Sequence, residues 1–81
     1  MSPKNQKATD EEFLCKLGEA IRERRLALGL SQEEVATKAD VHRTYLSDIE
    51  RGTRNITIRM LVQIANALQV NLAHLTRNCG R

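Results

Sequence analysis

The sequence predicts an all-α protein, a compact bundle of five helices. Apolar residues recur at helical spacing along most of the chain, and no segment alternates apolar and polar residues long enough to indicate a strand. Residues that favour helix starts and ends stand at the joints between these stretches. With 81 residues, of which 41% are hydrophobic and 28% charged, the chain suits a single small globular domain.

The first predicted helix spans about residues 10–28. Thr9 begins a capping signature, in which a residue with a hydroxyl is followed three positions later by a glutamate, here Glu12. Apolar residues then recur at helical spacing, namely Phe13, Leu14, Leu17, Ile21 and Leu28. Gly29 suits the left-handed residue that ends such a helix. The polar residues 1–8 are expected to form a flexible N-terminal tail.

Two short helices are expected next. Ser31 and Glu34 form a second capping box, which opens a helix that ends near Asp40. After a very short joint, a third helix is expected over about residues 42–51, and Gly52 ends it. The inward-facing residues of this pair are Val35, Ala36, Ala39, Leu46 and Ile49.

Two further helices complete the predicted bundle. Thr57 is expected to cap the fourth and Asn71 the short fifth. Their apolar faces carry Leu61, Ile64, Ala65 and Leu68, and then Leu72 and Leu75. The domain is therefore expected to span residues 9–77, and residues 78–81 are expected to form a C-terminal tail.

Several classes of protein do not fit this composition. No apolar run is longer than three residues, whereas a transmembrane helix needs about 20 and a secretory signal about 7–15. The two cysteines, Cys15 and Cys79, lie far apart, which fits a reducing cytoplasm better than a disulfide scaffold. Neither they nor His42 and His74 have metal-ligand spacing, so we expect no metal and no cofactor.

The same residues argue against an enzyme. No nucleophile-and-base arrangement stands out, the glycines form no phosphate loop, and the chain is too small for a substantial pocket. The net charge of +3 is by itself only a weak indication of a nucleic-acid partner.

The segment from Gln32 to Gly52 has the spacing of a helix-turn-helix. Ala36 is small where the two helices must cross closely, and Val41 is the apolar plug of the turn. The remaining polar residues share one face of the second helix, namely Arg43, Thr44, Ser47, Asp48 and Arg51. A polar stripe of this kind is commonly just a solvated surface, but after such a turn it could also enter the major groove of DNA.

The stretch from Leu17 to Leu75, about 59 of the 81 residues, resembles the lambda-repressor-like (Cro/C1, or XRE) helix-turn-helix family. The matching segments are residues 21–22, Arg25, residues 29–36, residues 49–52 and residues 64–70. Residues 42–55 look in particular like the controller proteins of restriction–modification systems. The sequence departs from the family at Asp40, where the left-handed turn residue is usually glycine, and at Arg24, where many relatives carry leucine.

The resemblance implies a role for each matching residue. Base reading in the major groove falls to Arg43, Thr44, Tyr45, Ser47 and Asp48. Contacts with the phosphate backbone fall to Gln32, Arg51, Arg54, Asn55 and Thr57. For Tyr45, shielding of the core edge is an equal alternative, and Asp48 could instead pair with Arg51 or Arg43. Arg25 and Glu50 match a partly buried ion pair of the family, which makes Glu50 structural.

The resemblance also implies the partners. We expect a sequence-specific transcriptional regulator that binds double-stranded DNA as a homodimer on an inverted repeat, with Met60 and Leu72 in the dimer interface. Some members of the family contact RNA polymerase at the position of Glu33 and Glu34, but helix capping and the helix dipole are the favoured explanation of these two acidic residues. A phage-type or other small XRE repressor, and a protein-interaction module that has lost DNA binding, are the alternatives.

Overall fold

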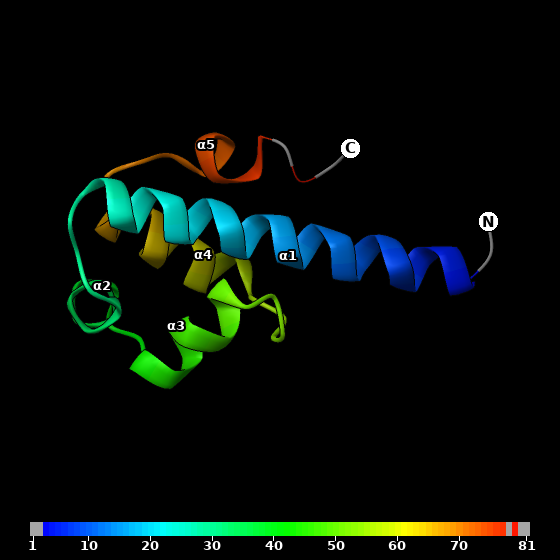
Figure 1. The fold of residues 1–81 in the computed structure, drawn as a ribbon, viewed down its shortest axis with the longest axis horizontal. Coiled ribbons are helices and arrows are strands. Elements are labelled where there is room, and N and C mark those ends of the chain that lie inside the picture. Colours follow the sequence, from blue (N-terminus) through cyan, green and yellow to red (C-terminus); the bar gives the residue numbers. More distant parts are fainter. Residues whose placement is uncertain (1–2, 78, 80–81) are drawn as a thin grey trace.

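Five helices make up the part of the chain that the structure describes, which is residues 3–77 and 79, with side chains from residue 10 onward. In this computed structural model they are α1 (Pro3–Ala27), α2 (Gln32–Ala39), α3 (Arg43–Glu50), α4 (Ile58–Ala67) and α5 (Leu72–Thr76). The long α1 lies between α3 on one side and α5 on the other, and α4 packs against α2 and α5 (Figure 1). The all-α class predicted from the sequence is confirmed.

The first helix is longer than predicted at its N-terminal end. It begins at Pro3 rather than near residue 10, so Thr9 lies inside the helix and is not its cap. Residues 3–8, expected as a tail, are helical in the structure, and only residues 1 and 2 of that tail lie outside the described part. The physical reason is that proline suits the first turn of a helix and nothing between Pro3 and Thr9 breaks one.

The predicted caps of the short helices are confirmed. The Ser31 hydroxyl accepts the backbone N–H of Glu34, and the Glu34 carboxylate accepts the N–H of Ser31, which completes the capping box of α2. The Thr57 hydroxyl accepts the N–H of Met60, and the Asn71 amide oxygen accepts the N–H of His74. These side chains satisfy backbone donors that have no partner within their own helix.

Each of the four joints between the helices contains a residue with left-handed backbone, namely Gly29, Asp40, Gly52 and Gln69. Asp40 has a φ of 59° and ends α2, as expected where the family usually places glycine. Gly52, with a φ of 75°, follows α3 so closely against α1 that a Cβ there would lie 2.8 Å from the Cα of Cys15. Inside α1, a Cβ on Gly18 would collide with the carbonyl oxygens of Ile49 and Glu50. These two glycines let α1 and the end of α3 approach closely.

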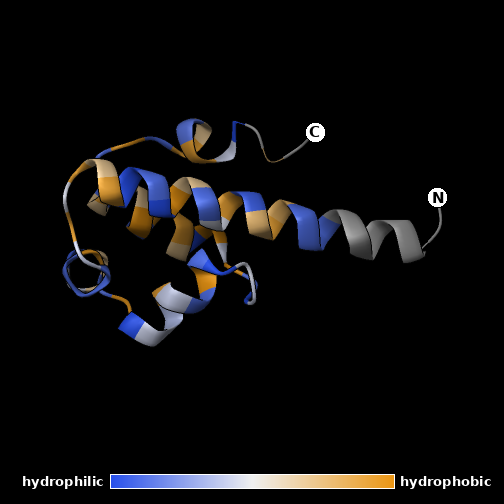
Figure 2. Ribbon diagram, viewed as in Figure 1, coloured by the Kyte–Doolittle hydropathy of each residue, from blue (hydrophilic) through white to orange (hydrophobic). Residues whose placement is uncertain are grey.

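The apolar faces of the helices meet in one aliphatic core (Figure 2). Its fully buried side chains are Leu17, Ile21, Val35, Leu46, Ile64, Leu68 and Leu75. Cys79 is buried as well, at 5% exposure, although the sequence placed it in a tail. The other tail residues, 78, 80 and 81, lie outside the described part.

Candidate DNA interface

The short helices α2 and α3 form the predicted helix-turn-helix. Leu46 and Ile49 hold α3 on the core, and Val41 in the turn packs against the same core. The opposite face of α3 is polar: Arg43, Thr44 and Arg51 are exposed, and Ser47 and Asp48 are half-buried. The face expected from the sequence therefore exists and points away from the core.

A buried ion pair ties the end of α3 to α1. Arg25 donates from Nε to Oε2 of Glu50 at 2.7 Å and from Nη2 to Oε1 at 2.9 Å, a bidentate arrangement. The two side chains are only 10% and 3% exposed. Hydrogen bonding to Glu50 raises the pKa of Arg25, against the opposing effect of burial. The pair expected from the resemblance is thus present, with strong geometry.

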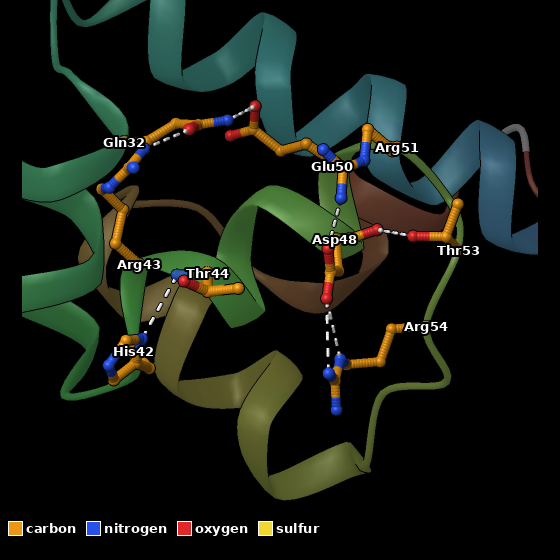
Figure 3. Close-up of polar contacts among 9 residues, drawn as sticks. All are labelled: Gln32, His42, Arg43, Thr44, Asp48, Glu50, Arg51, Thr53 and Arg54. Carbon is orange, nitrogen blue, oxygen red and sulfur yellow. Dashed lines mark hydrogen bonds and ion pairs between the residues drawn. The ribbon is translucent and has the colours of Figure 1, made fainter.

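A polar chain leads from this pair to the start of α3 (Figure 3). Gln32, the first residue of α2, donates from Nε2 to Oε1 of Glu50 at 3.0 Å. The other end of the same amide, Oε1, accepts a long hydrogen bond from Nη1 of Arg43 at 3.5 Å. The buried carboxylate therefore orients the Gln32 amide, and the exposed guanidinium of Arg43 lies within a long hydrogen bond of that amide.

At the other end of α3, Asp48 organises the following loop (Figure 3). Its carboxylate forms ion pairs with Arg51 and with Arg54, the latter at 3.3 Å. Its backbone carbonyl accepts both the N–H and the hydroxyl of Thr53, each at 3.1 Å. Of the two partners considered from the sequence, Arg51 is present. Arg43 does not contact Asp48, and its guanidinium lies beside Gln32.

Tyr45 supports this loop. Its ring packs partly against the core, and the guanidinium carbon of Arg54 lies 5.0 Å from the ring centroid. A cation over an aromatic face at this distance is attracted by the ring. Sequence reasoning missed this contact because Tyr45 and Arg54 lie nine positions apart, and no local sequence pattern links an aromatic residue to an arginine at that distance.

The remaining expected phosphate contacts flank this site. Asn55 and Thr57 are exposed in the segment between α3 and α4. The Thr57 hydroxyl already accepts the N–H of Met60, and its own proton is still able to donate. The backbone N–H groups at the start of α2, beside Gln32, give that helix end a partial positive charge.

The residues expected at a dimer interface lie on α4 and α5. Met60 and Leu72 are both half-buried, and Leu72 packs against the core of its own chain. More apolar surface is exposed nearby on α4, where Ile58 is 70% and Val62 38% exposed. These two are one helical turn apart and share a face.

Residues 3–77 and 79 contain no group of three or more His, Cys, Asp or Glu side chains arranged to hold a metal ion. Within the same residues, no helix is both long and apolar enough to cross a membrane.

Comparison with known proteins gives a consistent answer. A family model described as helix-turn-helix matches residues 21–75. The chain is 48% identical over 54 residues to the control protein C.BamHI of Bacillus amyloliquefaciens, a match that covers 65% of this chain and 67% of the relative.

Solved structures agree with this match. The fold is similar to the restriction–modification controller protein C.AhdI of Aeromonas hydrophila, with a TM-score of 0.75, 39% identity, and coverage of 76% of this chain and 94% of that one. It is also similar to the controller C.Esp1396I, solved as a tetramer on its natural operator of 35 base pairs, with a TM-score of 0.75, 37% identity, and coverage of 83% and 88%. The chain belongs to the Cro/C1-type helix-turn-helix family of DNA-binding transcriptional regulators.

Proposed function

We propose that this regulator is a restriction–modification controller that binds an inverted-repeat operator as a homodimer. The observation that carries the DNA-reading part is the outward polar face of α3, with Arg43 held at its start by Gln32. A protein-interaction module would have no reason to keep this face free of apolar residues. The identities of 37–48% to controller proteins support the restriction–modification part over a phage-type repressor.

The proposed mechanism assigns the two ends of α3 different tasks. At its start, Arg43 and Thr44 enter the major groove, where an arginine can donate to both O6 and N7 of guanine. Tyr45 and Ser47 flank them as secondary base contacts. At its end, Arg51, Arg54, Asn55 and Thr57 grip phosphates, and the start of α2 beside Gln32 binds another.

Dimerisation places two such faces on one side of the duplex. One helix-turn-helix unit contacts only a few base pairs, so two-fold pairing is needed for an operator of useful length. The two recognition helices of such a dimer lie about 34–36 Å apart, one turn of DNA. We assign the interface to Met60 and Leu72, with the exposed Ile58 and Val62 beside them. The assembly of C.Esp1396I as a tetramer on its operator supports pairing in this chain.

We also propose that the protein acts in the bacterial cytoplasm, where its DNA partner lies. Contact with RNA polymerase through Glu33 and Glu34 stays a prediction, and the Glu34 carboxylate is already engaged in the capping box.

The test is substitution of Arg43 by alanine. We expect Arg43→Ala to abolish the preference for one base in each half-site, at about 1–3 kcal/mol per contact, and to leave weak binding to other sequences nearly unchanged. Binding titrations against operator duplexes with each base changed in turn measure this preference. Full affinity together with full specificity in the variant would show that α3 is not the reading helix.

A further inference from the structure

The carboxylate of Asp48 lies between Arg51 and Arg54, two of the side chains that we propose bind phosphate. Asp48 is paired with Arg51 on one side and receives long bonds from Nε and Nη2 of Arg54, at 3.4 and 3.3 Å, on the other. The carboxylate is only 19% exposed, whereas the arginine side chains are 64% and 49% exposed. Arg51 and Arg54, which the proposed function assigns to phosphate, are therefore already paired with a carboxylate of the protein itself.

We propose that Asp48 lowers the affinity for DNA of any sequence by restraining the attraction of Arg51 and Arg54 to phosphate, and that it does not read a base. This inference rests on the proposed DNA-binding function and deepens it. The carboxylate lowers the formal charge of the cluster from two positive charges to one. A phosphate must share or displace Asp48 to bind either guanidinium, on any DNA sequence.

The restraint acts on binding to DNA of any sequence. Contacts with phosphate supply nearly all of sequence-independent binding, and each neutralised phosphate adds about 0.9 to the slope of log affinity against log salt. In the proposed function, bases are contacted at the opposite end of α3, where Arg43 lies beside Gln32 and has no contact with Asp48. Asp48 therefore weakens binding to specific and non-specific DNA by a similar factor and leaves the base contacts of Arg43 intact.

Asp48→Asn isolates this effect. The amide keeps the shape of the side chain and one oxygen that can accept from an arginine, but it removes the charge. The loop keeps its fold because Thr53 binds the backbone carbonyl of residue 48 and not its side chain. Glu19→Gln is the matched control, since it removes the same charge from an exposed position of α1 on the side that faces α5.

The experiment compares the unmodified protein, Asp48→Asn and Glu19→Gln on two duplexes over a salt series. One duplex is the sequence that the unmodified protein enriches most from a random library, and the other is a scrambled duplex of equal composition. For Asp48→Asn we expect about three- to tenfold tighter binding to the scrambled duplex near 150 mM salt, and a salt slope steeper by about one. Binding to the enriched duplex tightens by a similar factor, so the affinity ratio between the two duplexes stays unchanged. Glu19→Gln changes the affinity and the salt slope less.

Two outcomes would overturn the inference. Weaker binding of Asp48→Asn to both duplexes would show that the carboxylate positions the arginines for phosphate. A change confined to one base pair of the enriched duplex would show that Asp48 reads that base. Asp48→Ser repeats the comparison if melting shows that the asparagine variant is unfolded. If no duplex is preferred by any of the proteins, the proposed regulator function fails, whereas the change in salt slope on the scrambled duplex still decides the role of Asp48.

Discussion

At the scale of single residues, the guanidinium of Arg54 is shared between an aromatic ring and a carboxylate. The ring of Tyr45 lies on one side of the guanidinium, and the Asp48 carboxylate accepts from two of its nitrogens. The side chain is still 49% exposed, so donors remain for a ligand. A phosphate that binds Arg54 therefore competes with Asp48 for its positive charge.

We expect Arg54→Ala to weaken binding to every DNA sequence by a similar factor. The arginine is assigned to phosphate, which carries no sequence information, so its loss should reduce the salt slope by about one. Affinities for operator and scrambled duplexes, measured between low and physiological salt, give both quantities. An effect limited to a single operator base would contradict the phosphate role.

The ion pair of Arg25 and Glu50 gives a second prediction at this scale. Glu50→Ala leaves the Arg25 charge without its partner in a site where the side chain is only 10% exposed. We expect the free energy of unfolding to fall by about 3–5 kcal/mol. Urea unfolding at neutral pH measures this loss.

The control removes both charges together. The double variant Arg25→Met with Glu50→Leu strands no charge, so it should recover most of the stability lost in Glu50→Ala. A loss below about 1 kcal/mol for Glu50→Ala alone would match an exposed pair and contradict the burial described above.

At the scale of elements, the helix starts are the most local features of the fold. Four short helices were predicted close to their observed bounds, because a cap depends on a side chain and a backbone donor two or three residues later. The start of α1 was missed for the same reason. Thr9 and Glu12 have the spacing of a capping box, but that spacing does not forbid a helix from running through it.

The capping box of α2 predicts a pH dependence of stability. Hydrogen bonds from the backbone and the hydroxyl of Ser31 lower the pKa of Glu34. A carboxyl group whose pKa is lower in the folded state stabilises the fold above its unfolded pKa, about 4.3 for glutamate, and loses this effect as pH falls through the folded pKa. Unmodified protein should therefore be more stable than Glu34→Gln at neutral pH, and the difference should vanish in acid.

Thermal unfolding of both proteins from pH 7 to about pH 3 measures this difference. Glu33→Gln removes the same charge one residue away and leaves the Ser31 bonds intact, so it controls for the general effect of charge at the start of α2. A gap between unmodified protein and Glu34→Gln that stays constant across the pH range would refute the ionic contribution of the box.

Contacts between elements were predicted less well than the elements themselves. The approach of α1 to α3 at Gly18 depends on backbone atoms 31 and 32 residues away, and no local pattern marks it. The sequence left Asp48 open between reading a base and pairing with Arg51 or Arg43. A long arginine side chain can reach one carboxylate from many positions, so sequence spacing does not decide between such partners. The Arg25–Glu50 pair was expected only through the family resemblance. Cys79 was placed in a tail because its neighbours are polar, yet it packs on the core.

At the scale of the whole molecule, the described residues form an elongated body with extents of 40 × 22 × 20 Å, because the N-terminal part of α1 projects beyond the bundle (Figure 1). One such body presents a single copy of the polar face of α3, which we propose to read DNA. The exposed apolar residues Ile58 and Val62 lie on α4, a different element from that face. A two-fold pairing through α4 and α5 would therefore leave both reading faces free for one duplex.

The most direct test of the central claim is selection of bound duplexes from a random DNA library at about 150 mM salt, which suppresses binding by charge alone. We predict enrichment of an inverted repeat whose half-site centres lie about one helical turn apart, the signature of a dimer with two α3 helices on one side of the DNA. Enrichment of no sequence by a protein shown to be folded would contradict the claim that this chain reads DNA through α3.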